Sequence, residues 1–194
     1  VVLVPGLLCN PRLYGEQIPA LWQLGPVVVA DHTRDDTMAA IAGRLLATAP
    51  PRFAMVGLSM GGYIALEVLR QAPERVAKLA LLDTTARPDL PEQTEGRQRQ
   101  VELARAGRFA SIPDLLLPRF VAAAHLGDPA IVTTVRAMAH DTGAEAFIRQ
   151  QTAIMNRIDS RPSLAAIGCP TLVLVGEQDT LTPPERAAEM AEAI

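Results

Sequence analysis

Five short apolar runs along the chain have the length and composition of buried β-strands. They are aliphatic or β-branched, and they occupy Val1–Val4, Pro26–Ala30, Arg52–Leu58, Val76–Leu82 and Thr171–Val175. None shows the alternation of polar and apolar positions that is typical of a sheet with one solvent-exposed face. The pattern therefore predicts a parallel sheet whose strands are buried on both faces.

Segments with helical periodicity separate these runs. Apolar residues recur at three- and four-residue spacing in Met38–Ala49 and in Ile64–Ala72, where Pro73 ends the pattern. Pro184–Ile194 also has the composition of a helix. Alternation of strands and helices with short turns predicts βαβ crossovers. The expected fold class is α/β, with a doubly wound, mostly parallel sheet and helices on both faces.

The strand pattern stops between residues 86 and 161. Arg87–Arg97 is rich in proline and charge, which predicts a linker, and four helix-like stretches follow: Gln98–Ala106, Pro113–Ala124, Pro129–His140 and Glu145–Ile158. We interpret residues 86–161 as an all-helical cap inserted into a core of residues 1–85 and 162–194. Open α/β sheets bind ligands at the carboxyl ends of their strands, so we expect the cap there. The alternative is a set of packing helices without a role as a lid.

Composition narrows the function classes. The 194 residues are 49% hydrophobic and carry a net charge of −3, which is typical of one globular domain and gives no basic field for nucleic acid. All but one of the 18 basic residues are arginines, which we interpret as genome composition rather than as an anion site. No apolar run has the length of a membrane span, and no signal peptide is recognisable at the start. A cytoplasmic protein with a small-molecule partner is expected.

The two cysteines and the two ends of the chain complete this survey. Cys9 and Cys169 lie far apart in sequence, which favours neither a disulfide framework nor a metal-ligand cluster. The chain opens without an initiator methionine, inside an apolar run, and it closes inside a predicted helix. Because domains seldom stop in the middle of a helix, we expect further residues on the C-terminal side.

The strongest chemical motif is Gly57-Leu58-Ser59-Met60-Gly61. It follows an apolar run and opens a predicted helix, and its glycines permit the sharp turn that lifts a serine hydroxyl out of a sheet. Amides at the start of the helix then point at the reacting centre. A tight turn whose serine only caps the helix is the alternative. The motif and its context favour Ser59 as a nucleophile.

At this point the chain resembles the α/β-hydrolase-fold enzymes that carry a helical cap. The resemblance rests on four segments, LVPGLLCN (Leu3–Asn10), GLSMGGYIALE (Gly57–Glu67), LLDTTARPD (Leu81–Asp89) and CPTLVLVGEQDTLTPPE (Cys169–Glu185). It implies a catalytic triad of serine, acid and histidine, with the acid at Asp179 after the last predicted strand. Asp83 is the rival, since some relatives place the acid there, and Glu177 is read as a solvated neighbour.

The resemblance also implies an oxyanion hole, which needs two backbone N–H donors. One is the amide of Met60, directly after the nucleophile, and the other is the amide of Leu7 in the loop after the first strand. Relatives often have His-Gly where this chain has Pro5-Gly6. That difference keeps the backbone donor but removes a side chain that supports the loop. Cys9, just beyond, is interpreted as a small buried residue rather than a reactive thiol.

The general base is the missing member of the triad. The chain has three histidines, His32, His125 and His140. The resemblance places the base after one more strand, beyond the acid, whereas His32 follows the second predicted strand and the other two lie in the cap. We therefore expect none of them to reach both Ser59 and Asp179, and we expect the base outside these 194 residues.

The predicted function is a serine hydrolase that cleaves an ester, a lactone or a similar acyl bond through an acyl-enzyme on Ser59. No metal or organic cofactor is expected. A serine at this turn argues against dehalogenase or epoxide-hydrolase chemistry, which uses an aspartate there. Acyl transfer and carbon–carbon bond hydrolysis use the same groups and stay open, as does a non-catalytic binding protein on this fold. The sequence predicts neither the substrate nor the oligomeric state.

Overall fold

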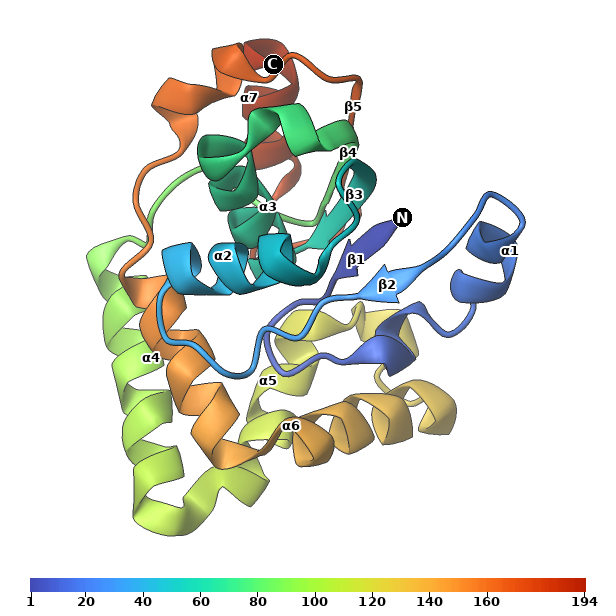
Figure 1. Ribbon diagram of the computed structural model, residues 1–194. Helices are drawn as coiled ribbons and strands as arrows, with labels where there is room; N and C mark the ends of the chain where they lie inside the picture. The colour runs from blue at the N-terminus through green and yellow to red at the C-terminus, as the bar shows by residue number, and fades with distance from the viewer.

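The computed structural model describes residues 1–194 and contains one five-stranded sheet (Figure 1). The strands are β1 (Val2–Val4), β2 (Val28–Val29), β3 (Phe53–Leu58), β4 (Val76–Leu82) and β5 (Thr171–Leu174). Their order is β2-β1-β3-β4-β5, and all neighbouring pairs are parallel. The predicted parallel α/β sheet is confirmed, with strand ends that differ from the predicted ones by at most two residues.

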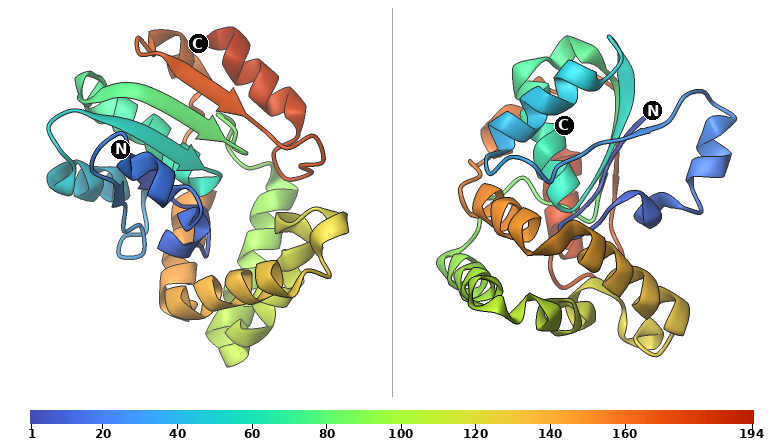
Figure 2. Two further views of the ribbon diagram at one scale, coloured as in Figure 1. Left: turned by 90° about the vertical axis from the view of Figure 1, so that its right-hand side faces the viewer. Right: turned by 60° about the horizontal axis from the view of Figure 1, so that its bottom comes forward.

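Helices lie on both faces of this sheet, as predicted. Helices α2 (Met38–Thr48) and α3 (Met60–Gln71) pack against each other on one face. The short helix α1 (Ile18–Trp22) lies on the other face, and α7 (Pro184–Ala193) packs against β5 (Figure 2). No helix is both long and apolar enough to cross a membrane.

The two faces of the sheet are covered unequally. Along β3 the residues on the side of α3 are buried, whereas the alternate positions are only half-buried. In β5, Leu172 and Leu174 are 55% and 50% exposed. The prediction that every strand is buried on both faces is therefore wrong for β5, and also for β2, where Val28 is 37% exposed. The apolar run alone could not show this, because a run without polar residues gives no sign of which face is left open.

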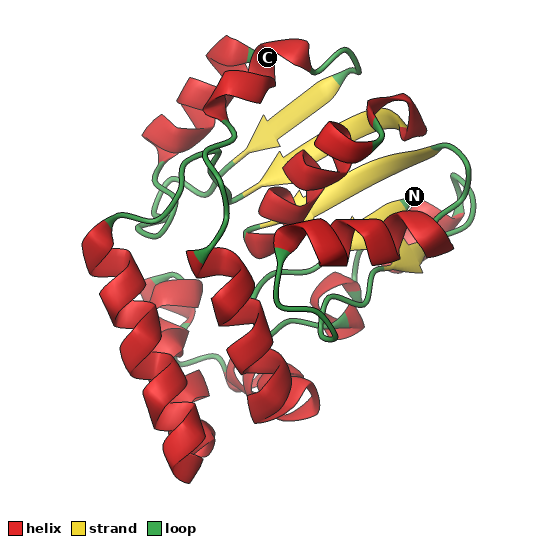
Figure 3. Ribbon diagram, turned by 60° about the vertical axis from the view of Figure 1, so that its left-hand side comes forward, coloured by secondary structure: helices red, strands yellow, loops and turns green.

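Residues 86–161 contain no strand and fold into three longer helices (Figure 3). These are α4 (Pro91–Leu103), α5 (Ile112–Phe120) and α6 (Pro129–Met155), and α6 is broken at Gly143, where φ is 75°. Short helical turns cover 104–108, 109–111 and 123–125, and others occupy 11–14, 73–75 and 161–166. The break in α6 falls in the predicted gap between two helical stretches.

The predicted linker Arg87–Arg97 is wrong over most of its length, because α4 begins at Pro91. Proline is favoured in the first turn of a helix, and the Leu90 N–H donates to Gln93 Oε1 at 2.8 Å, which caps the start. The helix contains few apolar residues, so its periodicity was too weak to recognise. Its proline and charge therefore resembled the composition of a linker.

A single hydrophobic cluster of 30 buried residues joins the sheet to the helical segment. Ile64 of α3 and Leu81 of β4 belong to it, and so do Ile112 of α5 and Phe147 of α6, all with exposed fractions of 0%. Because the helices share this core, α5 and α6 are held in a fixed position relative to the strands. This arrangement sets the geometry of the site below.

Candidate active site

Ser59 occupies a strained turn between β3 and α3. Its φ of 54° and ψ of −114° lie outside the regions that L-residues prefer. The Ser59 N–H donates to Leu82 O at 2.9 Å, and Thr84 Oγ1 donates to Ser59 O at 2.8 Å. The hydroxyl has no hydrogen-bond partner within residues 1–194, and it faces two cavities. Strain held by backbone bonds around a free hydroxyl is the arrangement expected of a nucleophile.

Three glycines make this turn sterically possible. A Cβ on Gly61 would lie 2.0 Å from Val4 O, and a Cβ on Gly57 would lie 2.4 Å from Gly61 O. A Cβ on Gly62 would lie 2.3 Å from Thr84 Oγ1, so this glycine allows α3 to approach the loop after β4. All three positions are therefore closed to any larger residue without movement of the backbone or of Thr84.

Two cavities meet at Ser59. The larger, of about 890 Å³, is lined by Ser59, Leu7, Asp83 and Asp179 from the sheet side. Apolar residues of the helical segment complete its wall, among them Phe120, Val121, Ile131, Val135 and Met138. The smaller, of about 370 Å³, lies between Ser59, α4 and α7. Residues 86–161 thus border both cavities at the carboxyl ends of the strands, and Ser59 is accessible from each of them.

Both candidate acids lie in the larger cavity. Asp179 Oδ1 accepts hydrogen bonds from the N–H groups of Leu181 (2.7 Å) and Thr182 (3.0 Å), and Oδ2 accepts one from Thr182 Oγ1 at 2.7 Å. Asp83 has a φ of 42°, and its Oδ1 accepts from the Gly176 N–H at 2.9 Å. The structure brings both carboxylates to the site of Ser59, and neither bonds a histidine. Glu177 is exposed and lines neither cavity.

The loop after β1 presents the candidate oxyanion donors. The amides of Leu7 and Met60 donate no hydrogen bond within the protein, whereas the neighbouring Leu8 amide, at φ 62°, donates to Gln150 Oε1 at 3.1 Å. Cys9 Sγ donates to Leu7 O at 3.4 Å. Burial raises the pKa of the Cys9 thiol to about 12, so it stays protonated at neutral pH. The Cys9 side chain is half-buried and lines the larger cavity, so the prediction of a buried residue is met only in part.

His32 and Gln150 contact the backbone of this loop, His32 at Gly6 O and Gln150 at the Leu8 N–H. Gln150 of α6 is 0% exposed and His32 is 2% exposed. His32 Nε2 lies 2.9 Å from Gly6 O and 3.2 Å from Gln150 Nε2. Burial lowers the pKa of His32, which favours the neutral ring. The single Nε2 atom then either donates to Gly6 O or accepts from Gln150 Nε2, depending on the tautomer. Sequence reasoning missed Gln150, because a glutamine inside a long helix gives no sign of its distant partner.

None of the three histidines forms a hydrogen bond with Ser59 or Asp179. His32 is committed to Gly6 and Gln150. His125 is exposed in its turn, and the side chain of His140 is 90% exposed beside Asp141. No group of three or more His, Cys, Asp or Glu side chains is arranged to hold a metal ion. Ser59, two carboxylates and two free amides thus lie around the same cavity, and no imidazole forms a hydrogen bond with Ser59 or Asp179.

Comparison with known proteins agrees with this geometry. The model of the alpha/beta hydrolase family matches residues 1–194, which is the whole chain. The chain belongs to the α/β-hydrolase family. The resemblance recognised from the four motif segments is confirmed.

Solved structures of this family superpose closely on the chain. A thermophilic esterase from Thermogutta terrifontis, solved with malate bound, is 31% identical, with a TM-score of 0.89 over 100% of this chain and 76% of that one. The enol-lactonase from Burkholderia xenovorans LB400 is 25% identical, with a TM-score of 0.88 over 100% of this chain and 78% of its own. Both proteins are hydrolases by name, and their backbones have the same fold as this chain.

Curated relatives have identities in a similar range and are also longer than this chain. A pimeloyl-[acyl-carrier protein] methyl ester esterase from Vibrio parahaemolyticus is 25% identical over 85% of this chain and 66% of its own length. A putative carbamate hydrolase, RutD, from Variovorax paradoxus is 29% identical over 100% of this chain and 79% of its own. The chain therefore spans about two thirds to four fifths of the length of these relatives. All four relatives named here are hydrolases of carbonyl compounds by name.

Proposed function

We propose that this protein is a serine hydrolase that cleaves an ester, a lactone or a similar acyl bond through an acyl-enzyme on Ser59. The observation that carries the proposal is the strained Ser59 turn, whose free hydroxyl faces a cavity beside two unbonded amides. The names of the relatives, two esterases, an enol-lactonase and a carbamate hydrolase, support an acyl bond as the target.

In the proposed reaction, Ser59 Oγ attacks the carbonyl carbon and gives its proton to a histidine. The amides of Leu7 and Met60 hold the oxygen that becomes negative, where water is largely excluded. The carbon–oxygen bond to the leaving group then breaks, and the histidine returns the proton to that group. Water repeats the sequence to release the acid. Asp179 orients the histidine and stabilises its cation.

In this proposal the histidine lies outside residues 1–194, since none of the three histidines present forms a hydrogen bond with Ser59 or Asp179. Residues 86–161 act as the cap in this proposal, and residues 1–85 and 162–194 form the core. The apolar wall of the larger cavity suits the organic part of a small acyl substrate. Chemistry of this type needs no metal or organic cofactor, and we keep the cytoplasm as the proposed compartment.

Kinetics of the complete protein test the proposal. A panel of p-nitrophenyl esters of increasing acyl length identifies a substrate that the unmodified protein cleaves. Ser59→Ala should then lower kcat/KM by about 1,000-fold or more, since the reaction loses its nucleophile. Ser111→Ala, whose hydroxyl bonds only Arg108 O in the helical segment, is the matched control and should keep full activity. Undiminished turnover by Ser59→Ala would contradict the proposal.

One observation favours a second candidate, a non-catalytic binding protein. The Ser59 hydroxyl has no imidazole beside it within residues 1–194. The same kinetic experiment separates the two functions, because a binding protein would cleave no ester of the panel while still retaining ligand. Product analysis in the presence of an alcohol or a thiol acceptor separates hydrolysis from acyl transfer.

A further inference from the structure

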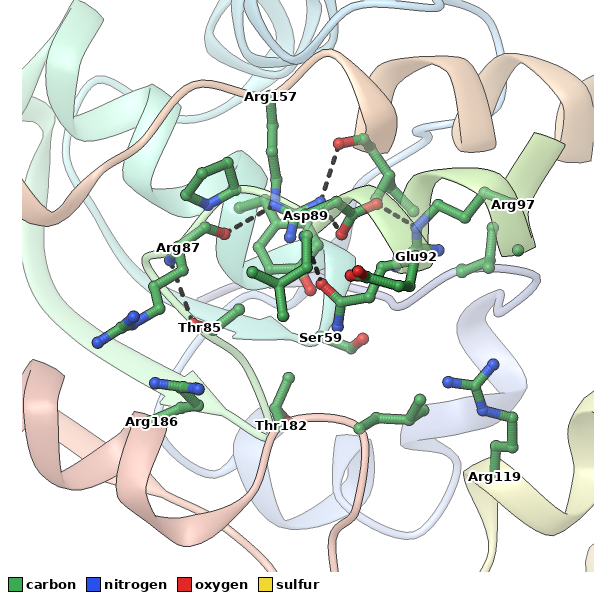
Figure 4. A pocket seen from close by; sticks show the side chains of 18 of the residues that line it. Ser59, Thr85, Arg87, Asp89, Glu92, Arg97, Arg119, Arg157, Thr182 and Arg186 are labelled. Carbon is green, nitrogen blue, oxygen red and sulfur yellow. Dashed lines mark hydrogen bonds and ion pairs between the residues drawn. The ribbon is translucent and has the colours of Figure 1, made fainter.

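The smaller cavity beside Ser59 is rich in arginine (Figure 4). Five of its lining residues are arginines, at positions Arg87, Arg97, Arg119, Arg157 and Arg186, against two carboxylates, Asp89 and Glu92. The chain as a whole carries a net charge of −3. Positive charge is therefore concentrated at this cavity although the protein as a whole is acidic. The interpretation of the arginines as genome composition alone does not explain this clustering.

Two of these arginines share one buried carboxylate. Asp89, with a side chain 2% exposed, accepts a hydrogen bond from Arg97 Nε at 2.7 Å and pairs with Arg157 Nη1 at 2.7 Å. The Arg157 side chain is only 6% exposed, and its guanidinium lies 4.2 Å from the centre of the Tyr63 ring. The cluster holds one more positive charge than negative. An excess charge at low exposure is unfavourable unless a counter-ion approaches it.

The remaining arginines differ in whether they are neutralised. Arg87 forms a two-point ion pair with Glu189, at 2.6 and 2.9 Å. Arg119 of α5 and Arg186 of α7 form no ion pair, and Figure 4 shows their guanidinium groups on the same side of the cavity as Thr182, below Ser59. Glu92 also faces the cavity and offsets one charge. Two free guanidinium groups and the Asp89 cluster still leave the cavity positive.

We propose that this cavity binds an anionic group of the substrate, and that the preferred substrate is an ester or lactone carrying a carboxylate. Arg119 and Arg186 are the two guanidinium groups of this cavity without an ion pair, and Figure 4 shows them at opposite ends of the cavity, so either can receive the carboxylate, whose two oxygens match a guanidinium fork. The Arg97–Asp89–Arg157 cluster adds a fixed positive field behind them. The inference rests on the proposed function, since it places the reacting carbonyl at Ser59 and the carboxylate in the smaller cavity.

A pair of matched substrates tests this inference on the complete protein. One is the mono-p-nitrophenyl ester of adipic acid, which carries a free carboxylate, and the other is its neutral methyl ester. We expect kcat/KM to be at least about tenfold higher for the charged substrate, as charge-assisted pairing predicts. High salt should reduce this ratio, because exposed arginines are screened.

Arginine variants identify the binding groups. Arg119→Gln and Arg186→Gln should each lower kcat/KM by a larger factor for the charged ester than for the neutral one, and the double variant should abolish the preference. Arg105→Gln, an exposed arginine outside both cavities, is the matched control. Equal kcat/KM for the two esters in the unmodified protein would overturn the inference. So would an equal loss for both esters in the double variant.

Binding measurements separate failure of this inference from failure of the proposed function. Calorimetry with the Ser59→Ala protein requires no turnover, and we expect adipate to bind more tightly than its dimethyl ester and than inorganic phosphate. Adipate binding without ester cleavage by the unmodified protein would contradict the hydrolase while keeping the anion site. Ester cleavage without adipate binding would contradict the anion site alone. Tighter binding of phosphate would overturn the assignment to a carboxylate.

Discussion

The turn at Ser59 and the helical segment of residues 86–161 border the same cavities, yet different physical constraints shape them. In the turn, backbone atoms approach so closely that a Cβ on Gly61 would lie 2.0 Å from a carbonyl oxygen. In the helical segment, Gly96 and Gly127 have no atom within 4 Å of a Cβ position, whereas Gly107 and Gly143 are restricted only by their positive φ of 74° and 75°. The turn therefore admits almost one local sequence, whereas the helices admit many.

In the proposed reaction, the sheet side supplies the reacting groups, and the helical segment supplies the residues that select the substrate. The nucleophile and both amide donors belong to the sheet side and depend on contacts that no substitution can relax. The helical part of the apolar wall and four of the five cavity arginines come from residues 87–157. A family with this division keeps one type of reaction and changes the substrate by changing the helices.

The largest expected effect concerns the acid on the sheet side. Asp179→Asn should lower kcat by about 1,000-fold or more on a neutral ester, because an amide cannot stabilise the histidine cation. Asp83→Asn should change kcat by less than about tenfold, since its carboxylate holds the Gly176 amide. Steady-state kinetics of the complete protein measure both. The reverse order of the two losses would make Asp83 the triad acid.

One substitution made in both regions contrasts them directly. Gly61→Ala should destabilise the protein by at least about 3 kcal/mol, because the new methyl group collides with Val4 O. Gly96→Ala, inside α4 with open space around it, should stabilise by about 0.5–1 kcal/mol through helix propensity. Urea unfolding of the complete protein measures both changes. Equal effects of the two variants would mean that the turn is not tightly packed.

Gln150 joins the two regions, because it reaches from α6 to the oxyanion loop. Gln150→Met keeps the volume of the side chain and removes the acceptor of the Leu8 N–H. We expect kcat on a neutral ester to fall about 10- to 100-fold with little change in KM, since the loop beside Leu7 is displaced. Gln150→Glu, which retains the acceptor oxygen, should restore most of the rate.

The neighbouring Gln151 is the control for this experiment. It is equally buried, at 0% exposure, but its amide bonds only Gln100 and Arg97 within the helical segment. Gln151→Met should therefore lower the midpoint of thermal unfolding as much as Gln150→Met while keeping kcat on the neutral ester. A parallel loss of kcat in both variants would show that Gln150 has only a structural role.

The smallest effect is a pH dependence of stability that originates in His32. Burial holds the pKa of His32 below its usual value of 6.5 in the folded protein, so the unfolded chain binds a proton more readily. Stability should therefore be fully present above pH 6.5 and decline as the pH falls below it. His32→Gln should remove this decline between pH 6.5 and 5, which thermal unfolding at a series of pH values measures. An identical pH profile in the variant would contradict the assignment.

The sheet and the Ser59 turn could be predicted because their determinants are local. Each strand is an apolar run that can be recognised without knowledge of its neighbours in the sheet. The motif Gly57–Gly61 contains, within five residues, the glycines that the sharp turn requires. The position of Asp179 was predictable only through resemblance to a family. Nothing around that aspartate differs from an ordinary turn, and its three accepted hydrogen bonds all come from the next three residues.

The determinants that escaped prediction are long-range. Leu8 and Gln150 are 142 positions apart, and the arginines of the smaller cavity come from five separate places in the chain. Helix α4 was missed because so few of its residues are apolar, and it is fixed instead by Pro91, Gln93 and ion pairs such as Arg97–Asp89. A local sequence pattern contains no information about such distant partners. The residues that line the two cavities could therefore be identified only from the three-dimensional structure.

The most direct test of the central claim is the position of a covalent label. The complete protein is treated with a fluorophosphonate ester, which reacts with activated serines, and digested peptides are sequenced by mass spectrometry. The account predicts a single phosphonylated residue, Ser59, in the peptide between Arg52 and Arg70, and no label in the Ser59→Ala protein. A label on another residue, or undiminished labelling of Ser59→Ala, would contradict it.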